Sequence, residues 1–380
     1  MVKHIIAKKN INSEKYDFVF AMSILLLFGV GFATLYSGSI YYAQRLFDDH
    51  LYFVAKQIKH FIAGFIFMMF FILIDFSVLR KALPFIMLGT FILCILPFVP
   101  GVGEERNGAL RWINIAGFTF QPSEMVKLCL ILFLANFFDK KNGKYDEPLI
   151  SIIAPFIITS LFVFLVYLGN DFSSSFFILI ISIVMFFIAG VPLLWFLKGL
   201  FCFLPILILM VITKEYRMER LLSFFDPSRS PLSSGFQIQA SLSALTSGGL
   251  WGQGLGNGVR KIASVPEIYS DFIFVVWAEE MGFIGVVFYI ALLAIFAIFG
   301  YRISFRCKSR FGAYASFGAV TCILVQSLVN CAVVSKLLPA TGIPLPFFSS
   351  GGSSLLVTFC LCGLVLNASG YVNKKGEING

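Results

Sequence analysis

The sequence predicts an all-α integral membrane protein, a polytopic bundle of about ten transmembrane helices with one large extracytoplasmic loop. Its composition is one reason: 58% of the 380 residues are hydrophobic and 13% are charged, whereas soluble domains are about half apolar and a quarter charged. The other is that apolar runs long enough to cross a bilayer recur along the chain. Their expected bounds are 17–38, 51–75, 82–100, 122–138, 149–168, 172–190, 192–213, 271–299, 312–334 and 347–370.

Polar segments flank a single predicted membrane domain, residues 17–370. Residues 1–16 form a polar arm without a clear signal-peptide cleavage site, and residues 371–380 form a short tail.

Lys and Arg concentrate in the cytoplasmic loops of membrane proteins. With the amino terminus inside, the basic residues of the inner segments are Lys3, Lys8, Lys9, Lys15, Arg80, Lys81, Lys140, Lys141, Lys144, Arg302, Arg306, Lys308, Arg310, Lys374 and Lys375. Those of the short outer loops are only Arg45, Arg106, Arg111 and Lys336. Both termini are therefore predicted to be cytoplasmic, and segment 214–270 to be extracytoplasmic.

Several classes of function are disfavoured. The net charge of +9 follows from the topological bias, so it gives no support for nucleic-acid binding. The eight cysteines fall in apolar segments or an inner loop and form no disulfide framework. The three histidines are scattered, which argues against a nucleophile triad, and no Walker A sequence occurs.

Two predicted outer loops, 101–121 and 214–270, are longer than the rest, which favours a functional role for them. Within the second, QIQASLSALTS is expected to form a short helix along the membrane surface, ended by SGG. The following GGLWGQGLGNG, residues 248–258, matches no phosphate-binding pattern, and we interpret it as a flexible or membrane-hugging loop.

Four carboxylates lie in SVPEIYSDFIFVVWAEEMGFIG, residues 264–285. Asp271 directly precedes an apolar run, so it is expected to cap the eighth span, to act as a general base with raised proton affinity, or to do both. Glu279 and Glu280 would lie about 12 Å deeper along a straight helix. Carboxylates at that depth need partners, so a structural ion pair is at least as good an explanation as catalysis.

Cations are predicted at the same face. Arg111 lies in the 101–121 loop, and Lys127 follows Glu124 by three residues, on the same face of a helix that starts at Pro122. Further positive charge near outer helix ends comes from Arg217, Arg220 and Lys336. Cations around a carboxylate suit a substrate with a lipid tail and phosphates, because they can stabilise a departing diphosphate while the carboxylate accepts a proton.

Five motifs then resemble a known family. They are Arg111-Trp112-Ile113, QPSEMVK (121–127), SGGLWGQGLGNG (247–258), PEIYSDFIFVVWAEEMGFIG (266–285) and PLPFFSSGGSS (344–354). With these motifs in order, the chain resembles the SEDS proteins (shape, elongation, division and sporulation), with their FtsW and RodA branches, from about residue 17 to 370. The resemblance implies a ten-helix fold and an inverting peptidoglycan glycosyltransferase. It would polymerise lipid II into glycan strands outside the bacterial cytoplasmic (inner) membrane, beside a class B penicillin-binding protein and other divisome membrane proteins.

Carried over position by position, the resemblance implies that Asp271 is the catalytic aspartate. It places Arg111, Glu124, Lys127 and Glu267 at the substrate, and the charge pattern adds Lys336. Two alternatives keep the same lipid substrate: a lipid II transporter, favoured by Glu279 and Glu280 within a span, and a RodA-type elongation polymerase. A non-catalytic scaffold is a third. The sequence establishes no cofactor, and both metal-free transfer and transfer assisted by a divalent cation such as Mg²⁺ or Mn²⁺ near Asp271 or Glu267 stay open.

The sequence departs from the family pattern at a few positions. Tyr269 and Ser270 stand where His-Thr is usual, Ser350 replaces a Tyr, and Thr119 stands where some members have a basic residue. Direct roles at these positions are therefore not inferred. The stretch GLGNGVRK is more similar to the division branch, FtsW, than to RodA.

Overall fold

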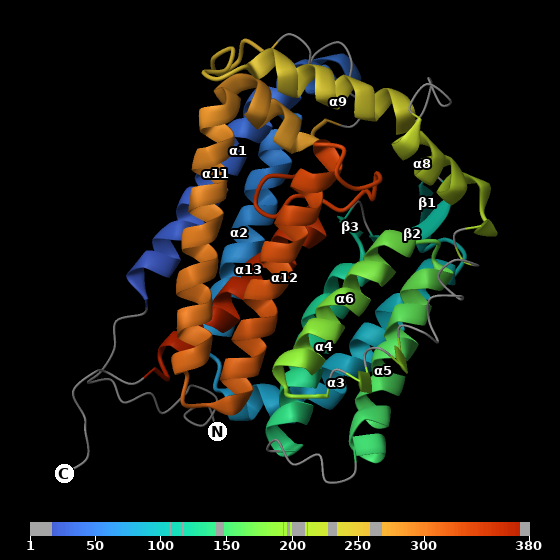
Figure 1. Cartoon of the computed structure of the whole chain (residues 1–380), viewed down its shortest axis with the longest axis vertical. Coiled ribbons are helices and arrows are strands. Elements are labelled where there is room, and N and C mark those ends of the chain that lie inside the picture. The colour runs from blue at the N-terminus through green and yellow to red at the C-terminus, as the bar shows by residue number, and fades with distance from the viewer. Residues whose placement is uncertain are drawn as a thin grey trace.

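The computed structural model of the chain is mainly helical, as predicted (Figure 1). It describes residues 17–106, 108–115, 118–141, 148–192, 194–195, 198–199, 210, 212–226, 234–258 and 268–372. The long helices are α1 (Phe18–Phe47), α2 (Tyr52–Leu73), α3 (Phe76–Ile95), α4 (Pro122–Lys141), α5 (Pro148–Leu168), α6 (Phe172–Ile188), α11 (Ile273–Arg306), α12 (Arg310–Val334) and α13 (Gly352–Ser369). Most of the expected seventh span, 192–213, lies outside the described residues, as do the arm 1–16 and most of the tail.

Six of the described helices are long and apolar enough to cross a membrane: α1, α2, α3 with its 3₁₀ extension η2 (Leu96–Phe98), α11, α12 and α13. Helices α5 and α6 carry shorter apolar stretches. Helix α13 is buried among α2, α12 and α4, whereas α3 exposes large side chains such as Phe85 and Leu88. Apolar side chains on an outer surface are the expected solution for helices in contact with lipid. The chain is a multi-pass membrane protein.

Side-chain caps explain where several helices begin. Asp17 accepts a hydrogen bond from the backbone N–H of Phe20 at the start of α1. Asp75 caps α3 through Ser77, so that helix begins at Phe76, six residues before the expected start, and contains Pro84. Ser309 caps α12 through Gly312. Hydropathy detects only the apolar part of a helix, whereas these caps fix the backbone end.

The first long loop contains a small sheet that the sequence analysis treated only as a loop. Strands β1 (Gly103–Arg106), β2 (Ala109–Ile115) and β3 (Phe118–Phe120) pair antiparallel in that order. Glu104 lies opposite Trp112, and the Arg106 guanidinium lies 5.2 Å from the centre of the Trp112 ring. The sheet fixes the position of Arg111 in the middle of β2, which a mobile loop would not do.

Helix α11 folds back on itself at Gly282, whose φ of 63° and ψ of −163° are not helical. The indole N–H of Trp277 donates to the carbonyl of Gly285 at 2.8 Å, and the rings of Phe274 and Tyr289 lie 5.3 Å apart. In a straight helix those last two residues would be about 22 Å apart along the axis. The expected straight eighth span is therefore wrong: residues 273–281 form a short arm that turns at Gly282 into the long segment 283–306.

The glycine-rich segment 248–258 packs on this turn. The N–H groups of Phe283 and Ile284 donate to the carbonyls of Gly249 and Leu250, and those of Gln253 and Gly254 donate back to Glu279 and Glu280. A Cβ on Gly252 would lie 2.1 Å from the Glu280 carbonyl oxygen, so only glycine permits this approach. The segment is a backbone clamp on the turn rather than a phosphate cradle.

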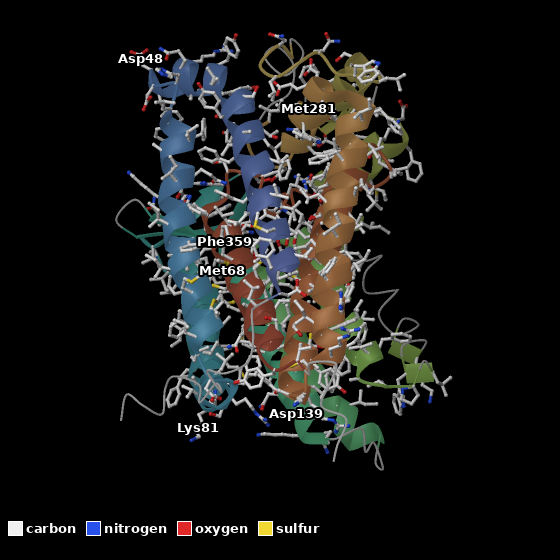
Figure 2. All side chains as sticks on the ribbon, turned by 90° about the vertical axis from the view of Figure 1, so that its left-hand side faces the viewer. Asp48, Met68, Lys81, Asp139, Met281 and Phe359 are labelled. Atoms are coloured by element: carbon white, nitrogen blue, oxygen red, sulfur yellow. The ribbon has the colours of Figure 1, made fainter. Side chains whose placement is uncertain are left out.

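The helix predicted before this segment is confirmed as α9 (Ser234–Gly248). It runs crosswise at one end of the bundle, next to α8 (Glu215–Phe225) (Figure 1). Asp48 and Met281 lie toward that same end, and Lys81 and Asp139 lie at the opposite one (Figure 2). Phe20, near the start of α1, lies against Gly300, and Tyr371, after α13, stacks on Phe76. Both ends of the described chain therefore lie toward the Lys81 end.

Candidate functional site

The backbone of Asp271 is held by α12. The side-chain amide of Asn330 donates to the carbonyl oxygen of Asp271 at 2.7 Å and to that of Ile343 at 2.9 Å. One turn earlier on the same face, the Gln326 amide donates to Pro344 at 2.9 Å. Two amides of one buried helix face thus join the segment before α11 to the segment before α13.

Asp271 does not cap α11, so that expectation is wrong. The N-cap is Phe272, without a side-chain cap, because the chain turns into the helix one residue later than expected. The half-buried carboxylate instead accepts a hydrogen bond from the Ser270 hydroxyl at 2.9 Å. A Cβ on Gly342 would lie 3.2 Å from its other oxygen, so a glycine with φ of 73° leaves room beside it.

Burial raises the pKa of the Asp271 carboxyl above its ordinary value, because it disfavours the ionised form. The Ser270 hydrogen bond and the positive charges of Arg111 and Arg220 act in the opposite direction, and the negative charge of Asp171 adds to the increase. The charges of Arg111, Arg220 and Asp171, from separate parts of the chain, thus all influence the pKa of Asp271. A carboxylate with raised proton affinity is suited to accept a proton near neutral pH.

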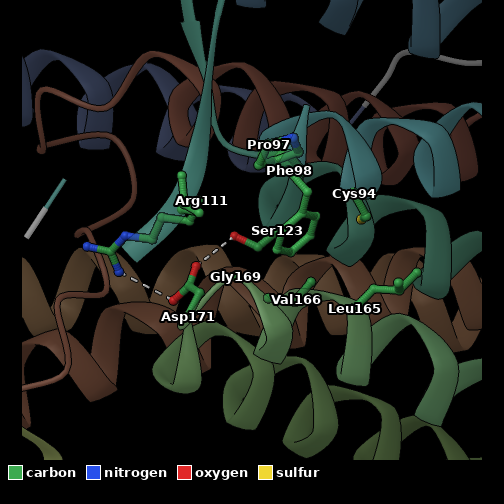
Figure 3. Close-up of a pocket in the computed structure, with 11 residues that line it drawn as sticks. Cys94, Pro97, Phe98, Arg111, Ser123, Leu165, Val166, Gly169 and Asp171 are labelled. Carbon is green, nitrogen blue, oxygen red and sulfur yellow. Dashed lines mark hydrogen bonds and ion pairs between the residues drawn. The ribbon is translucent and has the colours of Figure 1, made fainter. Parts of the chain in front are cut away.

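Arg111 is held by Asp171, a residue that the sequence analysis did not single out (Figure 3). The Arg111 guanidinium lies 3.4 Å from one Asp171 oxygen, while Gln121 and Ser123 donate to the other at 2.7 and 3.2 Å. Asp171 is 2% exposed and also caps α6 through the N–H of Ser174. An Asp before an apolar run is typical of a cap, so the sequence held a signal for that role but none for the pairing with Arg111.

A cavity beside this pair is lined by Arg111, Ser123 and Asp171 together with apolar side chains (Figure 3). Its volume is about 20 Å³, enough for one water molecule. A sugar or a diphosphate does not fit inside it. A large substrate would therefore bind outside this cavity.

Helix α8 brings two further cations toward the site. Arg220 donates to the carbonyl of Ala340 at 3.4 Å, in the segment that also contains Gly342. Arg217 is buried between the rings of Tyr167 and Phe172, 4.9 and 5.0 Å from their centres. Of the two, Arg220 acts on Asp271, whereas Arg217 ties α8 to the α5–α6 connection.

Glu124 and Lys127 form the predicted pair on α4, 2.7 Å apart, with both side chains almost fully buried. The Lys127 ammonium also donates to Gln326 at 2.8 Å and lies 5.4 Å from the centre of the Phe177 ring. Through Gln326 the pair supports the Pro344 segment beneath Asp271. In this structure the contacts of Lys127 are thus with buried side chains that support the site, and not with Asp271 or Arg111.

Three other carboxylates and one lysine complete the predicted set. Glu267 lies outside the described residues. Glu280 accepts hydrogen bonds from the Ser37 hydroxyl and from the N–H of Gly256, the latter at 3.1 Å. With Glu279 it lies at the turn of α11 against the glycine-rich segment, so the expectation that both carboxylates lie deep in one straight span is wrong. Lys336 follows α12 with φ of 57° and makes no hydrogen bond or ion pair with Asp271, Arg111 or Asp171.

Three substituted family positions are accommodated locally. Tyr269 stacks on Phe53 with ring centres 4.2 Å apart, and Ser270 supplies the hydroxyl that a Thr would supply. The N–H of Ser350 donates to the Tyr269 carbonyl at 2.9 Å. The Ser349 hydroxyl donates to the Ser270 carbonyl at 2.6 Å. These contacts join the 344–354 motif to the Asp271 segment.

Comparison with known proteins gives consistent results. A family model described as "Cell cycle protein", covering FtsW, RodA and SpoVE, matches residues 17–374. A protein named "Probable peptidoglycan glycosyltransferase FtsW" from Geobacter sp. (strain M18) is 38% identical over 94% of this chain and 97% of its own. "Stage V sporulation protein E" of Bacillus subtilis (strain 168) is 35% identical over 93% of this chain and 97% of its own.

Solved structures agree in fold. A chain from "Structural coordination of polymerization and crosslinking by a peptidoglycan synthase complex" is 27% identical, with a TM-score of 0.78 over 94% of this chain and 98% of that one. The rod shape determining protein RodA of Thermus thermophilus is 25% identical, with a TM-score of 0.67 over the same shares. The match of sequence and fold over nearly the whole length shows that this chain belongs to the FtsW/RodA/SpoVE family of cell cycle proteins.

Proposed function

We propose that this chain is a peptidoglycan glycosyltransferase that polymerises lipid II into glycan strands at the outer face of the bacterial cytoplasmic membrane. The observation that carries the proposal is Asp271, whose backbone is held by α12 and whose carboxylate is acted on by the guanidiniums of Arg111 and Arg220. The names of the curated relatives support the activity. Relatives named FtsW and the GLGNGVRK stretch support a role in septal synthesis during cell division rather than elongation.

In the proposed reaction Asp271 removes the proton from the acceptor sugar hydroxyl. The oxygen attacks the anomeric carbon of the donor, the bond to the diphosphate oxygen breaks, and undecaprenyl diphosphate leaves with the bonding electrons. One displacement inverts the anomeric centre. Arg111 and Arg220 are the cations placed to offset the charge that develops on the diphosphate. The Glu124–Lys127 pair contacts Gln326 through Lys127 and so supports the Pro344 segment. We therefore assign the two residues a positioning role rather than the expected direct contact with substrate.

Within the described part of the chain no group of three or more His, Cys, Asp or Glu side chains is placed to hold a metal ion. Asp171 is already occupied by Arg111, Gln121 and Ser123. A divalent cation would therefore depend on Asp271, Glu267 and the substrate phosphates.

Two partners follow from the proposal. The nascent glycan strand is the second reactant beside lipid II. A class B penicillin-binding protein is the expected transpeptidase, in keeping with the synthase complex named for the related solved structure. Helix α9 lies at the Asp48 end, where such a partner and other division proteins would meet the active face.

The transporter alternative loses its main argument. It depended on Glu279 and Glu280 lying within a straight span, and both lie at the turn of α11 against the glycine-rich segment. A transporter needs a charged path exposed in turn to each side. A scaffold without catalysis predicts that Asp271 and Arg111 can be replaced without loss of growth.

The deciding experiment is polymerisation of labelled lipid II by the purified full chain with its transpeptidase partner, with and without divalent metal. Asp271→Asn keeps the size of the side chain and removes the base, so the rate should fall by about two to four decades. Asp48→Asn, at the same end but on the exposed α1–α2 turn, is the control and should retain the wild-type rate. A stably folded Asp271→Asn variant that polymerises at the wild-type rate would refute the assignment.

A further inference from the structure

A second cavity lies beside Lys81, at the end of the molecule opposite Asp48 (Figure 2). Its volume is about 550 Å³, and it lies among the start of α3, the end of α4, the start of α12 and the residues after α13. Its polar lining includes Asp75, Ser77, Arg80, Lys81, Lys140 and Tyr371. No part of the proposed glycosyl transfer uses these residues.

The charges of the cavity are fixed in part by the protein itself. Arg80 lies 2.7 Å from Asp139 and donates to Asn136 at 3.0 Å, and its guanidinium lies 5.6 Å from the centre of the Phe311 ring. Lys81 and Lys140 remain exposed, and neither forms an ion pair within the described ranges. Asp75, the acidic lining residue, is engaged by the N–H of Ser77. Two exposed ammonium groups therefore face a cavity whose carboxylate is already hydrogen-bonded.

Hydroxyl donors add to the positive lining. Ser77 and Tyr371 contribute hydroxyl groups, and the Tyr371 ring stacks on Phe76 with centres 5.0 Å apart. Burial and the negative charge of Asp75 raise the pKa of Tyr371 to about 12, so its phenol keeps its proton at physiological pH. Ammonium groups and hydroxyl donors together suit an anion with several acceptor oxygens.

The position of the cavity identifies the level of the membrane at which it lies. Helices α2, α11 and α13 end here, and α3 and α12 begin here, all of them long enough to cross a bilayer. The ends of spanning helices mark the headgroup region. Phosphate groups of lipids lie at this level, and anionic lipids attract cations placed there.

We propose that this cavity binds a phosphate-bearing anion, and its place at the helix ends points to the headgroup of an anionic phospholipid as the source. Lys81 and Lys140 would contact the phosphate, with Ser77 and Tyr371 donating to its oxygens. The lipid chains would lie along the exposed apolar face of α3, which carries Phe85 and Leu88. A soluble phosphate has the same chemistry and is the alternative source.

The test uses native mass spectrometry of the full chain in detergent, titrated with dioleoyl phosphatidylglycerol, dioleoyl phosphatidylcholine or glycerol 3-phosphate. Phosphatidylglycerol should bind wild type more tightly than phosphatidylcholine. The Lys81→Ala/Lys140→Ala variant should lose about 25-fold in that affinity, because each cation near an anionic headgroup contributes about a factor of five. Both lysines are exposed, so this variant should fold.

A matched control and a second variant make the result specific. Arg302→Ala/Arg306→Ala removes two exposed cations from the same end of the bundle that do not line the cavity, and it should leave the affinity within about twofold. Asn136→Asp keeps an acceptor for Arg80 while adding negative charge, and it too should weaken binding. Equal losses in the two double variants, or no loss in either, would overturn the proposal. Lysine-dependent binding of glycerol 3-phosphate with no preference for the lipid would support the phosphate site and overturn its lipid source.

Discussion

The Ser270 hydroxyl donates a hydrogen bond to the Asp271 carboxylate, while burial acts against ionisation of the same group. A base must be ionised to accept a proton, so activity should be lost as the pH falls through the pKa of Asp271. Because that pKa is raised, the loss should begin at a higher pH than for an ordinary aspartate. The acid side of the pH–rate profile therefore reports on this carboxylate.

Replacing Ser270 tests this balance. Ser270→Ala removes a hydrogen bond that favours the ionised carboxylate, so the acid limb of kcat should move to higher pH. Ser270→Thr keeps the hydroxyl and should leave the limb in place. The measurement is the pH dependence of lipid II polymerisation for the three proteins. An unchanged acid limb in Ser270→Ala would mean that another group limits the rate at low pH.

Asp171 is expected to act through Arg111. Asp171→Asn removes the negative charge beside the guanidinium, so Arg111 should become less well positioned, and KM for lipid II should rise about tenfold. A residue with a purely structural role would lower the melting temperature without this change in KM. The sharper measurement is a double-mutant cycle with Arg111→Lys, in which the two changes should not be additive. Additive effects would show that the two side chains act independently.

The turn of α11 depends on one glycine. Gly282 has a backbone conformation that is almost restricted to glycine, and a Cβ there would lie 2.3 Å from the N atom of Gly252. Gly282→Ala should therefore destabilise the protein by at least about 1–3 kcal/mol. Gly89→Ala, within α3 and with open space around it, is the matched control and should be neutral or slightly stabilising.

Thermal unfolding in detergent measures both variants. A clear fall in melting temperature for Gly282→Ala alone is the expected result. Equal melting temperatures for Gly282→Ala and Gly89→Ala would contradict the strained turn. A lipid II assay on the same samples would show whether the turn also affects Asp271, which lies at the other end of the short arm.

The elements differ in how far the sequence could predict them. Apolar runs located each long described helix, because helices in lipid have apolar compositions. The end of α1, the start of α3 and the end of α11 nevertheless lie six or more residues from the expected positions. The reversal within α11 was missed because both of its segments are apolar and share one run, and a glycine in such a run indicates only a weaker helix. The sheet was missed because its strands are short and contain few β-branched residues.

The residues of the site likewise differ in how far the sequence could predict them. Asp271, Arg111 and the Glu124–Lys127 pair were predicted because charges are rare in this chain and lie near its helix ends. Asn330 and Gln326 carried a usable signal, since two amides one turn apart within an apolar helix need partners. Asp171 could not be paired with Arg111, because their contact joins segments about 60 residues apart and leaves no local pattern.

The whole molecule has two chemically different ends. Arg80, Lys81, Lys140 and Arg306 lie at one end, with both ends of the described chain, and Asp48 lies at the other. By the distribution of positive charge the first end should face the cytoplasm. Asp271 and the elements around it would then be reached from outside the cell.

Cysteine labelling in intact cells tests this orientation. In a background with the eight native cysteines replaced, Asp48→Cys should react with a membrane-impermeant maleimide, and Lys140→Cys should react only after the cells are lysed. Both positions are exposed, so a difference in reactivity reports the side of the membrane. The reverse pattern would invert the topology and would remove the extracytoplasmic site.

The short helical arm between Asp271 and Gly282 mechanically connects the carboxylate to the glycine-rich segment. Residues 273–281 make a rod about 13 Å long, with the carboxylate at one end and the glycine clamp at the other. Tilting such a rod by about ten degrees displaces its far end by roughly 2 Å, and a shift of about 1 Å can cost a hundredfold in rate. A partner that tilts this arm through the glycine-rich segment would therefore be expected to displace the carboxylate and change the rate of the proposed transfer.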